Sequence, residues 1–168
     1  KVNGPQKVFY DTGKIREKST LKNGVYDGLF TDYYKDYEDG TVNKTCYYLN
    51  GKLNGQLTGY YPSGNVRISC NYVNDLISGE FTEYYDSTKV VKEKGRYLNN
   101  KRDGLWTAYY PGGNLFATGN YLNELYEGEW KSYYENGKKK KKGSYNKGEA
   151  TGEWTFYYET GELQNKGN

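Results

Sequence analysis

One motif recurs seven times along the chain at nearly constant spacing, and this repetition restricts the fold more than any other feature. The motif is a glycine, any residue, a large apolar residue, two further residues, a Tyr-Tyr pair, two turn-forming residues and usually a second glycine, as in GLWTAYYPGG at residues 104–113. The opening glycines are Gly4, Gly28, Gly55, Gly79, Gly104, Gly128 and Gly152, with spacings of 24, 27, 24, 25, 24 and 24 residues. A fixed period of this length is typical of a repeat array in which each unit packs on its neighbours. The sequence therefore predicts a single array over residues 1–168.

Each unit has the pattern of a β-hairpin. Tyr, Trp, Phe and Thr favour strands, and turn signals such as Pro-Gly-Gly at residues 111–113 and Glu-Asn-Gly at residues 135–137 separate two segments of strand length. The link between units, as in residues 99–104, is interpreted as a second and wider turn. No segment has an apolar period of 3.6 residues, so we expect no helix. The predicted fold is all-β: an elongated single-layer antiparallel meander of about seven stacked hairpins.

The alternation of side chains along a strand assigns residues to faces. The large apolar position (Phe30, Leu57, Phe81, Trp106, Trp130 and Trp154) shares a face with the second Tyr of each pair. On the return strand, Leu115 and its equivalents are expected on the face of Gly119 and Tyr121. A two-residue turn would put Leu115 on the face of Trp106, whereas a three-residue turn with a glycine bulge would pair it with the first Tyr. We favour the two-residue turn because it gathers the most apolar positions on one face.

Composition limits the chemistry of the chain. It contains no His, which removes the commonest general base and metal ligand, and its net charge is only +3. Cys46 and Cys70 occupy the same position in successive units, so they should lie two strands apart, about 10 Å, which is too far for a disulfide. We therefore predict two separate thiols. We also expect no catalytic activity, no metal or cofactor, no nucleic-acid partner and no transmembrane segment.

The motif G-x-W-x-x-Y-Y-x-x-G at a period near 24 resembles the MORN repeat, specifically its bacterial variant form. The similarity extends from Gly4 to Gly161, with the first unit departing from it at Gln6 and Phe9. The resemblance implies a β-sheet scaffold for interaction or assembly, with no shared active site. It also implies alternatives: an antitoxin or immunity-type protein that binds a toxin, or a surface that binds phospholipid. Stacking on Tyr rings leaves carbohydrate binding open as well. The compartment stays open between a bacterial cell surface or secreted location, which we favour, and the cytoplasm.

The candidate binding residues follow from the face assignment. Aromatic side chains in an exposed row mark interaction surfaces. The candidate partner-binding face is therefore the ladder of first tyrosines, Tyr33, Tyr60, Tyr84, Tyr109, Tyr133 and Tyr157. The lysine run at residues 138–142 is a second candidate, in which Lys138, Lys140 and Lys142 would share one face and contact an anionic partner. The predicted function is a non-catalytic scaffold that binds another protein through a Tyr-rich face or a sheet edge. A glycan or an anionic lipid is the alternative partner.

Overall fold

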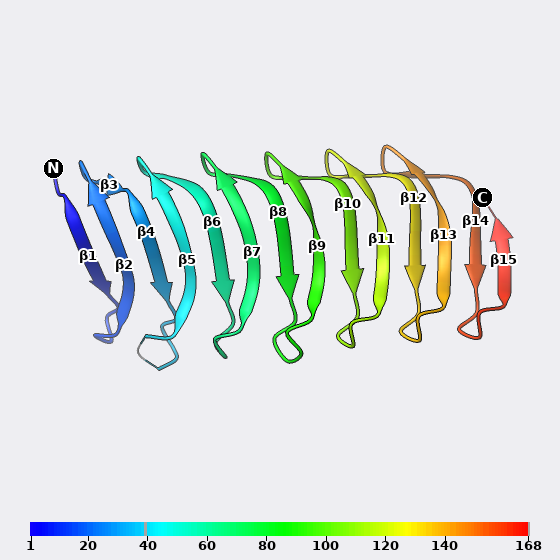
Figure 1. Ribbon diagram of the computed structural model, residues 1–168, viewed down its shortest axis with the longest axis horizontal. Helices are drawn as coiled ribbons and strands as arrows, with labels where there is room; N and C mark the ends of the chain where they lie inside the picture. The colour runs from blue at the N-terminus through cyan, green and yellow to red at the C-terminus, as the bar shows by residue number, and fades with distance from the viewer. Residues whose placement is uncertain (39, 168) are drawn as a thin grey trace. The chain divides into compact units, whose positions relative to one another are not determined.

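The computed structural model describes residues 1–38 and 40–167, and these residues form strands and no helix (Figure 1). The chain divides into two compact units, Lys1–Gly79 and Glu80–Asn168, and the division falls within β8 (Leu76–Tyr84). Unit 1 contains β1 (Gly4–Phe9), β2 (Ile15–Lys22), β3 (Val25–Tyr26), β4 (Gly28–Tyr33), β5 (Val42–Leu49), β6 (Lys52–Tyr60) and β7 (Val66–Val73). Unit 2 contains β9 (Val91–Leu98), β10 (Lys101–Tyr109), β11 (Leu115–Leu122), β12 (Leu125–Tyr133), β13 (Lys139–Asn146), β14 (Glu149–Tyr157) and β15 (Leu163–Gly167).

Within each unit the strands pair antiparallel with their neighbours in the chain. Unit 1 has the strand order β1-β2-β4-β5-β6-β7, with the short β3 paired to β2, and unit 2 runs from β9 to β15 in order. Each unit is therefore an open single-layer sheet of hairpins, as Figure 1 shows. The predicted all-β antiparallel meander is confirmed in both units. Residues 39 and 168 of the predicted array lie outside the described residues.

In the repeats that open at Gly4, Gly55, Gly104, Gly128 and Gly152, the inner turn has three residues, so the two-residue turn that we favoured is wrong. The Tyr110 amide donates to the Asn114 carbonyl at 2.8 Å, and the Gly113 amide donates to the Tyr110 carbonyl at 2.8 Å. Gly113 has a φ of 91°, a left-handed conformation that a side chain would disfavour. This is a type I turn followed by a glycine bulge, the usual form of a three-residue hairpin loop. The second glycine of the motif is explained by that backbone conformation.

A second irregularity follows two residues later and decides which residues share a face. Ala108 is opposite Ala117, but Tyr109 is opposite Leu115, so Phe116 is an extra residue in β11. The strand therefore changes register, and Leu115 lies on the face of Tyr109 while Gly119 lies opposite Trp106. Our expectation that Leu115 shares a face with Gly119 and Trp106 is wrong for this reason. We call the face of the large apolar position the Trp face and the face of the first tyrosines the Tyr face.

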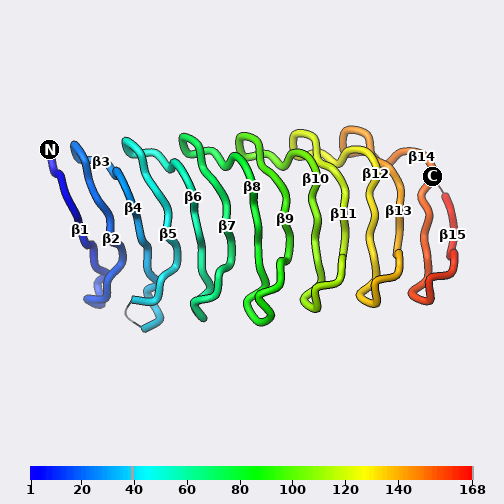
Figure 2. Tube along the Cα trace, viewed as in Figure 1, coloured from blue at the N-terminus to red at the C-terminus, as the bar shows by residue number. Residues whose placement is uncertain are grey.

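The link between repeats is the tight turn, contrary to the wider turn that we expected. Leu98 is opposite Lys101, and the two residues between them, Asn99 and Asn100, have φ values of 50° and 67°. Positive φ at both positions defines a type I′ turn, which Asn and Gly tolerate best. The register then shifts between Asp103 and Thr107, where the opening Gly104 has a φ of 79°. The opening glycine of the motif is thus the residue that lets the strand bend out of register. Figure 2 shows the two kinds of turn at opposite ends of the strands in each unit.

The core lies on the Trp face, where a large side chain covers a small one. Phe30, Leu57, Trp106 and Trp154 are all buried. A Cβ atom added to Gly95, Gly119 or Gly143 would lie 2.3, 2.1 and 2.1 Å from the rings of Trp106, Trp130 and Trp154, respectively. In unit 1 the smaller Leu57 lies opposite both Cys46 and Cys70. Tryptophan therefore goes with glycine and leucine with cysteine, which keeps the combined volume nearly constant.

Adjacent repeats are joined by side-chain hydrogen bonds in addition to the strand pairing. The hydroxyl of the second Tyr donates to the carbonyl of the first Tyr in the next repeat. The bonds are Tyr10 to Tyr33 at 2.7 Å, Tyr34 to Tyr60 at 2.7 Å, Tyr85 to Tyr109 at 3.0 Å, Tyr110 to Tyr133 at 2.9 Å and Tyr134 to Tyr157 at 2.8 Å. At the other end of the strands, the Gly148 amide donates to the Tyr126 carbonyl at 2.9 Å. The Tyr-Tyr pair is therefore a connector between repeats.

The two cysteines are free thiols, as predicted. Cys46 is 1% exposed and Cys70 is 3% exposed. Burial raises the pKa of the Cys70 thiol to about 11 and also raises the pKa of Cys46. A thiol is a nucleophile only as the thiolate, so both residues should be unreactive near neutral pH.

We expect iodoacetamide at pH 8 to label neither cysteine in the folded protein and both in guanidinium chloride, as measured by mass spectrometry. The raised pKa also has a consequence for stability. Because the folded thiol of Cys70 binds its proton more tightly than the unfolded thiol, its contribution is present below pH 9 and is lost as the pH rises towards 11. Labelling of native Cys70 at the rate of an exposed thiol would contradict its burial.

Candidate functional site

An open groove on the Trp face of unit 2 is the candidate site. Its volume is about 450 Å³, within the range of ligand pockets. We call it the aromatic groove, because its walls consist mainly of the rings of Tyr126, Trp130, Tyr134, Tyr145, Trp154 and Phe156. Its polar lining includes Ser132, Lys140, Lys141 and Gln164. The residues come from β11 to β15, so the groove depends on side chains of consecutive repeats.

The rings of the groove hold one another in place. The Trp130 ring centre lies 4.6 Å from that of Tyr126, and the Trp154 ring centre lies 5.0 Å from that of Tyr145, both edge to face. Tyr126 and Tyr145 are in tilted contact at 4.9 Å. Burial, together with the neighbouring Tyr126, raises the pKa of Tyr145, which keeps its hydroxyl neutral. The walls are therefore preorganised, since each such ring pair adds about 0.5–1.5 kcal/mol beyond area burial.

Two lysines give the groove a positive charge. The Lys140 Nζ lies 5.5 Å from the Tyr134 ring centre, and the Lys141 Nζ lies 5.3 Å from the Trp154 ring centre. Among the described residues, neither ammonium group forms an ion pair. Lys131 also borders the groove, but its charge is paired with Glu129 at 2.6 Å. Two ammonium groups are thus held over rings without a carboxylate partner.

Two buried polar groups in the walls have no hydrogen-bond partner within the described part of the chain. They are the hydroxyl of Ser132 and the indole Nε1 of Trp154, and both side chains belong to residues that are only 8% exposed. The indoles of the two preceding repeats are satisfied, because Trp106 donates to the Arg96 carbonyl at 3.2 Å and Trp130 donates to the Asn120 carbonyl at 3.0 Å. A buried group without a partner costs about 1–3 kcal/mol. The groove walls therefore contain two hydrogen-bond donors that are not satisfied by the described part of the chain.

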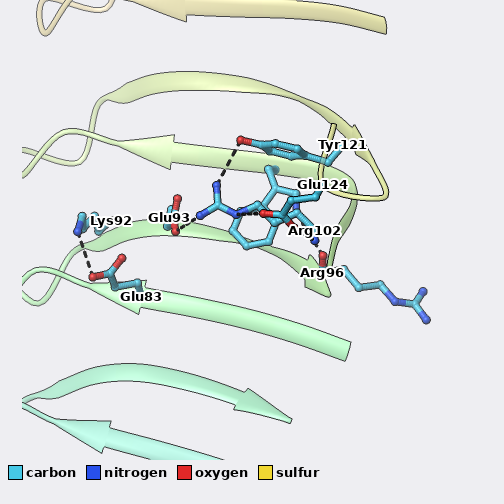
Figure 3. A network of polar contacts seen from close by, with 8 residues as sticks. Glu83, Lys92, Glu93, Arg96, Arg102, Tyr121 and Glu124 are labelled. Atoms are coloured by element: carbon cyan, nitrogen blue, oxygen red, sulfur yellow. Dashed lines mark hydrogen bonds and ion pairs between the residues drawn. The ribbon is translucent and has the colours of Figure 1, made fainter. Parts of the chain in front are cut away.

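Arg102 lies over the ring of Trp106, in the repeat that precedes Trp130. Figure 3 shows its guanidinium between Tyr121, Glu93 and Glu124. The group stacks 4.3 Å from the Trp106 ring centre, bonds to Glu93 at 3.0 Å and donates to the Tyr121 hydroxyl at 3.2 Å. Burial opposes the charge of Arg102, but its hydrogen bonds with Tyr97 and Tyr121 and the charge of Glu93 outweigh burial and raise its pKa. Its hydrogen-bonding groups are thus engaged by the protein itself, unlike those of Lys140 and Lys141.

The first tyrosines, which we singled out as a binding ladder, lie outside the aromatic groove. Tyr33 is buried, at 6% exposure. Tyr60, Tyr84, Tyr109, Tyr133 and Tyr157 are half-buried. The extra residue at Phe116 puts Leu115 opposite Tyr109 on the Tyr face. Tyr60 and Tyr157 likewise lie opposite Val66 and Leu163, whereas Tyr133 lies opposite Lys139. Sequence reasoning missed the groove because it took the Trp face to be core and nothing else.

The three lysines predicted to share one face do not do so. Tyr133 is opposite Lys139 and Ser132 is opposite Lys141, so Lys140 is the extra residue in β13. Lys140 therefore turns to the groove beside Lys141, while Lys142 lies opposite Lys131. Lys138 precedes the strand, and its Nζ donates to the Thr160 carbonyl at 2.6 Å. The lysine run is thus divided between two faces and a turn.

Within residues 1–38 and 40–167, no group of three acidic, Cys or His side chains is placed to hold a metal ion. No helix in these ranges is long and apolar enough to cross a membrane.

Consecutive hairpins that present a ring-lined face define a β-hairpin repeat protein. The model of the MORN repeat variant family matches residues 2–23, 53–74, 102–123, 126–147 and 150–168, which is more than half of the chain. The protein therefore belongs to the MORN repeat family, as the motif predicted. The unmatched stretches hold the repeats that open at Gly28 and Gly79, where the motif is interrupted or lacks its last glycine. A comparison with curated proteins finds no match. MORN repeats are generally repeat modules for interaction with proteins or membrane lipids.

Proposed function

We propose that this protein is a non-catalytic scaffold that binds another protein through the Trp face of unit 2. The observation that carries the proposal is the aromatic groove, an opening of about 450 Å³ on the Trp face of unit 2. Trp and Tyr are the residues most often found at the energetic centres of protein interfaces. The ring contacts fix the walls before a partner arrives, which reduces the conformational entropy lost on binding.

Catalysis finds little support in this arrangement. The chain has no His, and the titratable side chains lining the groove are tyrosines and lysines. General acid–base chemistry needs a group whose pKa lies near the working pH. Burial moves the pKa of Tyr145 upward, away from neutrality. The groove is better suited to holding a partner than to transferring a proton.

A photo-cross-linking experiment tests the proposal. Benzoylphenylalanine replaces Gln164, which is exposed and borders the groove, and in a matched variant it replaces Leu105, which is 61% exposed on the Tyr face. After irradiation in an extract of the source cells, the Gln164 variant should capture one discrete protein that the Leu105 variant does not. The captured protein is then purified, and its binding to the unmodified chain is measured by calorimetry. Capture from both positions alike, or purified components that do not bind, would refute the proposed interface.

A further inference from the structure

We infer that the aromatic groove recognises an acidic segment of its protein partner, with a carboxylate beside Lys140 and Lys141 and apolar side chains against the rings. This inference rests on the proposed function and names the chemistry of the partner. The first argument is charge complementarity. The lining of the groove includes no acidic residue, and among the described residues neither Lys140 nor Lys141 has an ion-pair partner. The third lysine, Lys131, is paired with Glu129 and lies opposite Lys142 on the Tyr face. A carboxylate that enters the groove finds two ammonium groups that the protein leaves unpaired.

The unpartnered polar groups provide an independent argument. The Ser132 hydroxyl and the Trp154 indole are both donors, and neither has an acceptor within the described part of the chain. A site whose free groups are two ammoniums, a hydroxyl and an indole N–H calls for a ligand rich in acceptors. Carboxylates are the protein side chains that accept without donating. The Ser132 oxygen and the Trp154 Nε1 both have almost no exposed surface, so both side chains must move before either group can reach a ligand.

The register of β13 favours a peptide over a membrane surface. Binding to an anionic bilayer depends on several basic residues presented together. Here the extra residue at Lys140 sends Lys140 and Lys141 to the groove and leaves Lys139 and Lys142 on the Tyr face. The lysine run therefore forms no common cationic surface, whereas two lysines beside a ring-lined groove match one acidic side chain flanked by apolar ones.

Fluorescence anisotropy with defined peptides tests this inference. The probes are fluorescein-labelled ten-residue peptides in which Glu alternates with Leu, Phe or Val, and the control set carries Gln in place of Glu. The acidic set should bind the wild-type chain and the Gln set should bind at least tenfold more weakly. Lys140→Gln with Lys141→Gln should weaken binding of the acidic set at least tenfold. The matched pair Lys139→Gln with Lys142→Gln removes the same charge from the Tyr face and should change binding less than twofold.

A second variant separates recognition from folding. Ser132→Ala removes the unpartnered hydroxyl and gives this position the residue that the preceding repeat has at Ala108. It should raise the midpoint of chemical denaturation while weakening the binding of the acidic peptides severalfold. A purely structural role for Ser132 would leave peptide binding unchanged.

Several results would overturn the inference. Equal weakening by the two lysine pairs would show general attraction rather than a site, and so would acidic peptides that fail to bind. Binding to phosphatidylcholine–phosphatidylglycerol vesicles without binding to any peptide would assign the groove to lipid. If the partner captured from Gln164 binds the Lys140→Gln, Lys141→Gln chain unchanged, the acidic segment is wrong and the proposed function stands. If the peptides bind as expected but no protein is captured at Gln164, the proposed function fails and the chemistry of the groove stands.

Discussion

Gly119→Ala is expected to destabilise unit 2 by about 3 kcal/mol. The new Cβ would lie 2.1 Å from the Trp130 ring, far inside van der Waals contact. The ring contacts Tyr121, Tyr126 and Tyr145 and donates to the Asn120 carbonyl, so a displacement that relieves the clash breaks these contacts. The free energy of unfolding in guanidinium chloride measures the effect. The matched control is Gly112→Ala, because Gly112 lies in an exposed turn where a Cβ meets nothing closer than 3.9 Å. That change should cost less than about 0.5 kcal/mol.

The clash with Trp130 can be separated from any general intolerance of Gly119 by a compensating change. Gly119→Cys combined with Trp130→Leu recreates the Cys46 and Leu57 pair of unit 1. If the volumes of the two positions are coupled, the double variant should be more stable than Gly119→Cys alone, with a coupling energy of about 1–2 kcal/mol. Additive effects would show that the glycine is required for its backbone and not for the ring that covers it.

Trp106→Ala is expected to cost about 4 kcal/mol, the largest effect of any single side-chain truncation in unit 2. Trp106 is 3% exposed, and its ring contacts Phe81, Tyr97 and Tyr121. Its removal leaves a cavity and also takes away the ring under the Arg102 guanidinium, 4.3 Å distant. Loss of the cation–π attraction between that ring and the guanidinium adds to the cost.

The size of this effect is checked by thermal and guanidinium denaturation, with Trp106→Phe as the matched variant. Phe81 occupies the same position in the preceding repeat, so the Trp106→Phe chain should retain more than half of the stability that the Trp106→Ala chain loses. Unchanged melting of Trp106→Ala would show that the Trp face is not the core of this unit.

The periodicity of the sequence was enough to predict the hairpin, the stacking and the separate thiols. The repeat of Gly104 and its equivalents gave the period, and Cys46 and Cys70 followed from it because equivalent positions lie two strands apart. The positions of the two turns were interchanged. Asn50-Gly51 is a strong signal for a two-residue type I′ turn, and the structure has positive φ at both residues. Weighing that dipeptide would have placed the tight turn at the link between repeats.

The faces and the groove could not have been predicted in the same way. The composition of β11 or β13 does not reveal the extra residue at Phe116 or Lys140. That residue nevertheless changes the face on which the preceding residue of the strand, Leu115 or Lys139, lies. Because Lys140 is the extra residue of β13, it lies on the face of Lys141 and not on that of Lys142. The unpartnered Trp154 indole was equally hidden, because Trp106, Trp130 and Trp154 share the same motif and differ only in the carbonyl that each can reach.

The hydrogen bonds of the second tyrosines reach only from one repeat to the next, so a whole repeat can be lost or gained while every remaining repeat keeps a partner of the same kind. Loss of the 24 codons for residues 104–127 would join Asp103 directly to Gly128 and bring Gly95 under Trp130, a pairing of the same kind as the one it replaces. Tyr85 would then find the Tyr133 carbonyl where it now finds that of Tyr109. Replication slippage by whole multiples of 24 codons would therefore encode proteins in which the contacts between adjacent repeats are intact. The number of repeats could change in this way during evolution without any new kind of contact.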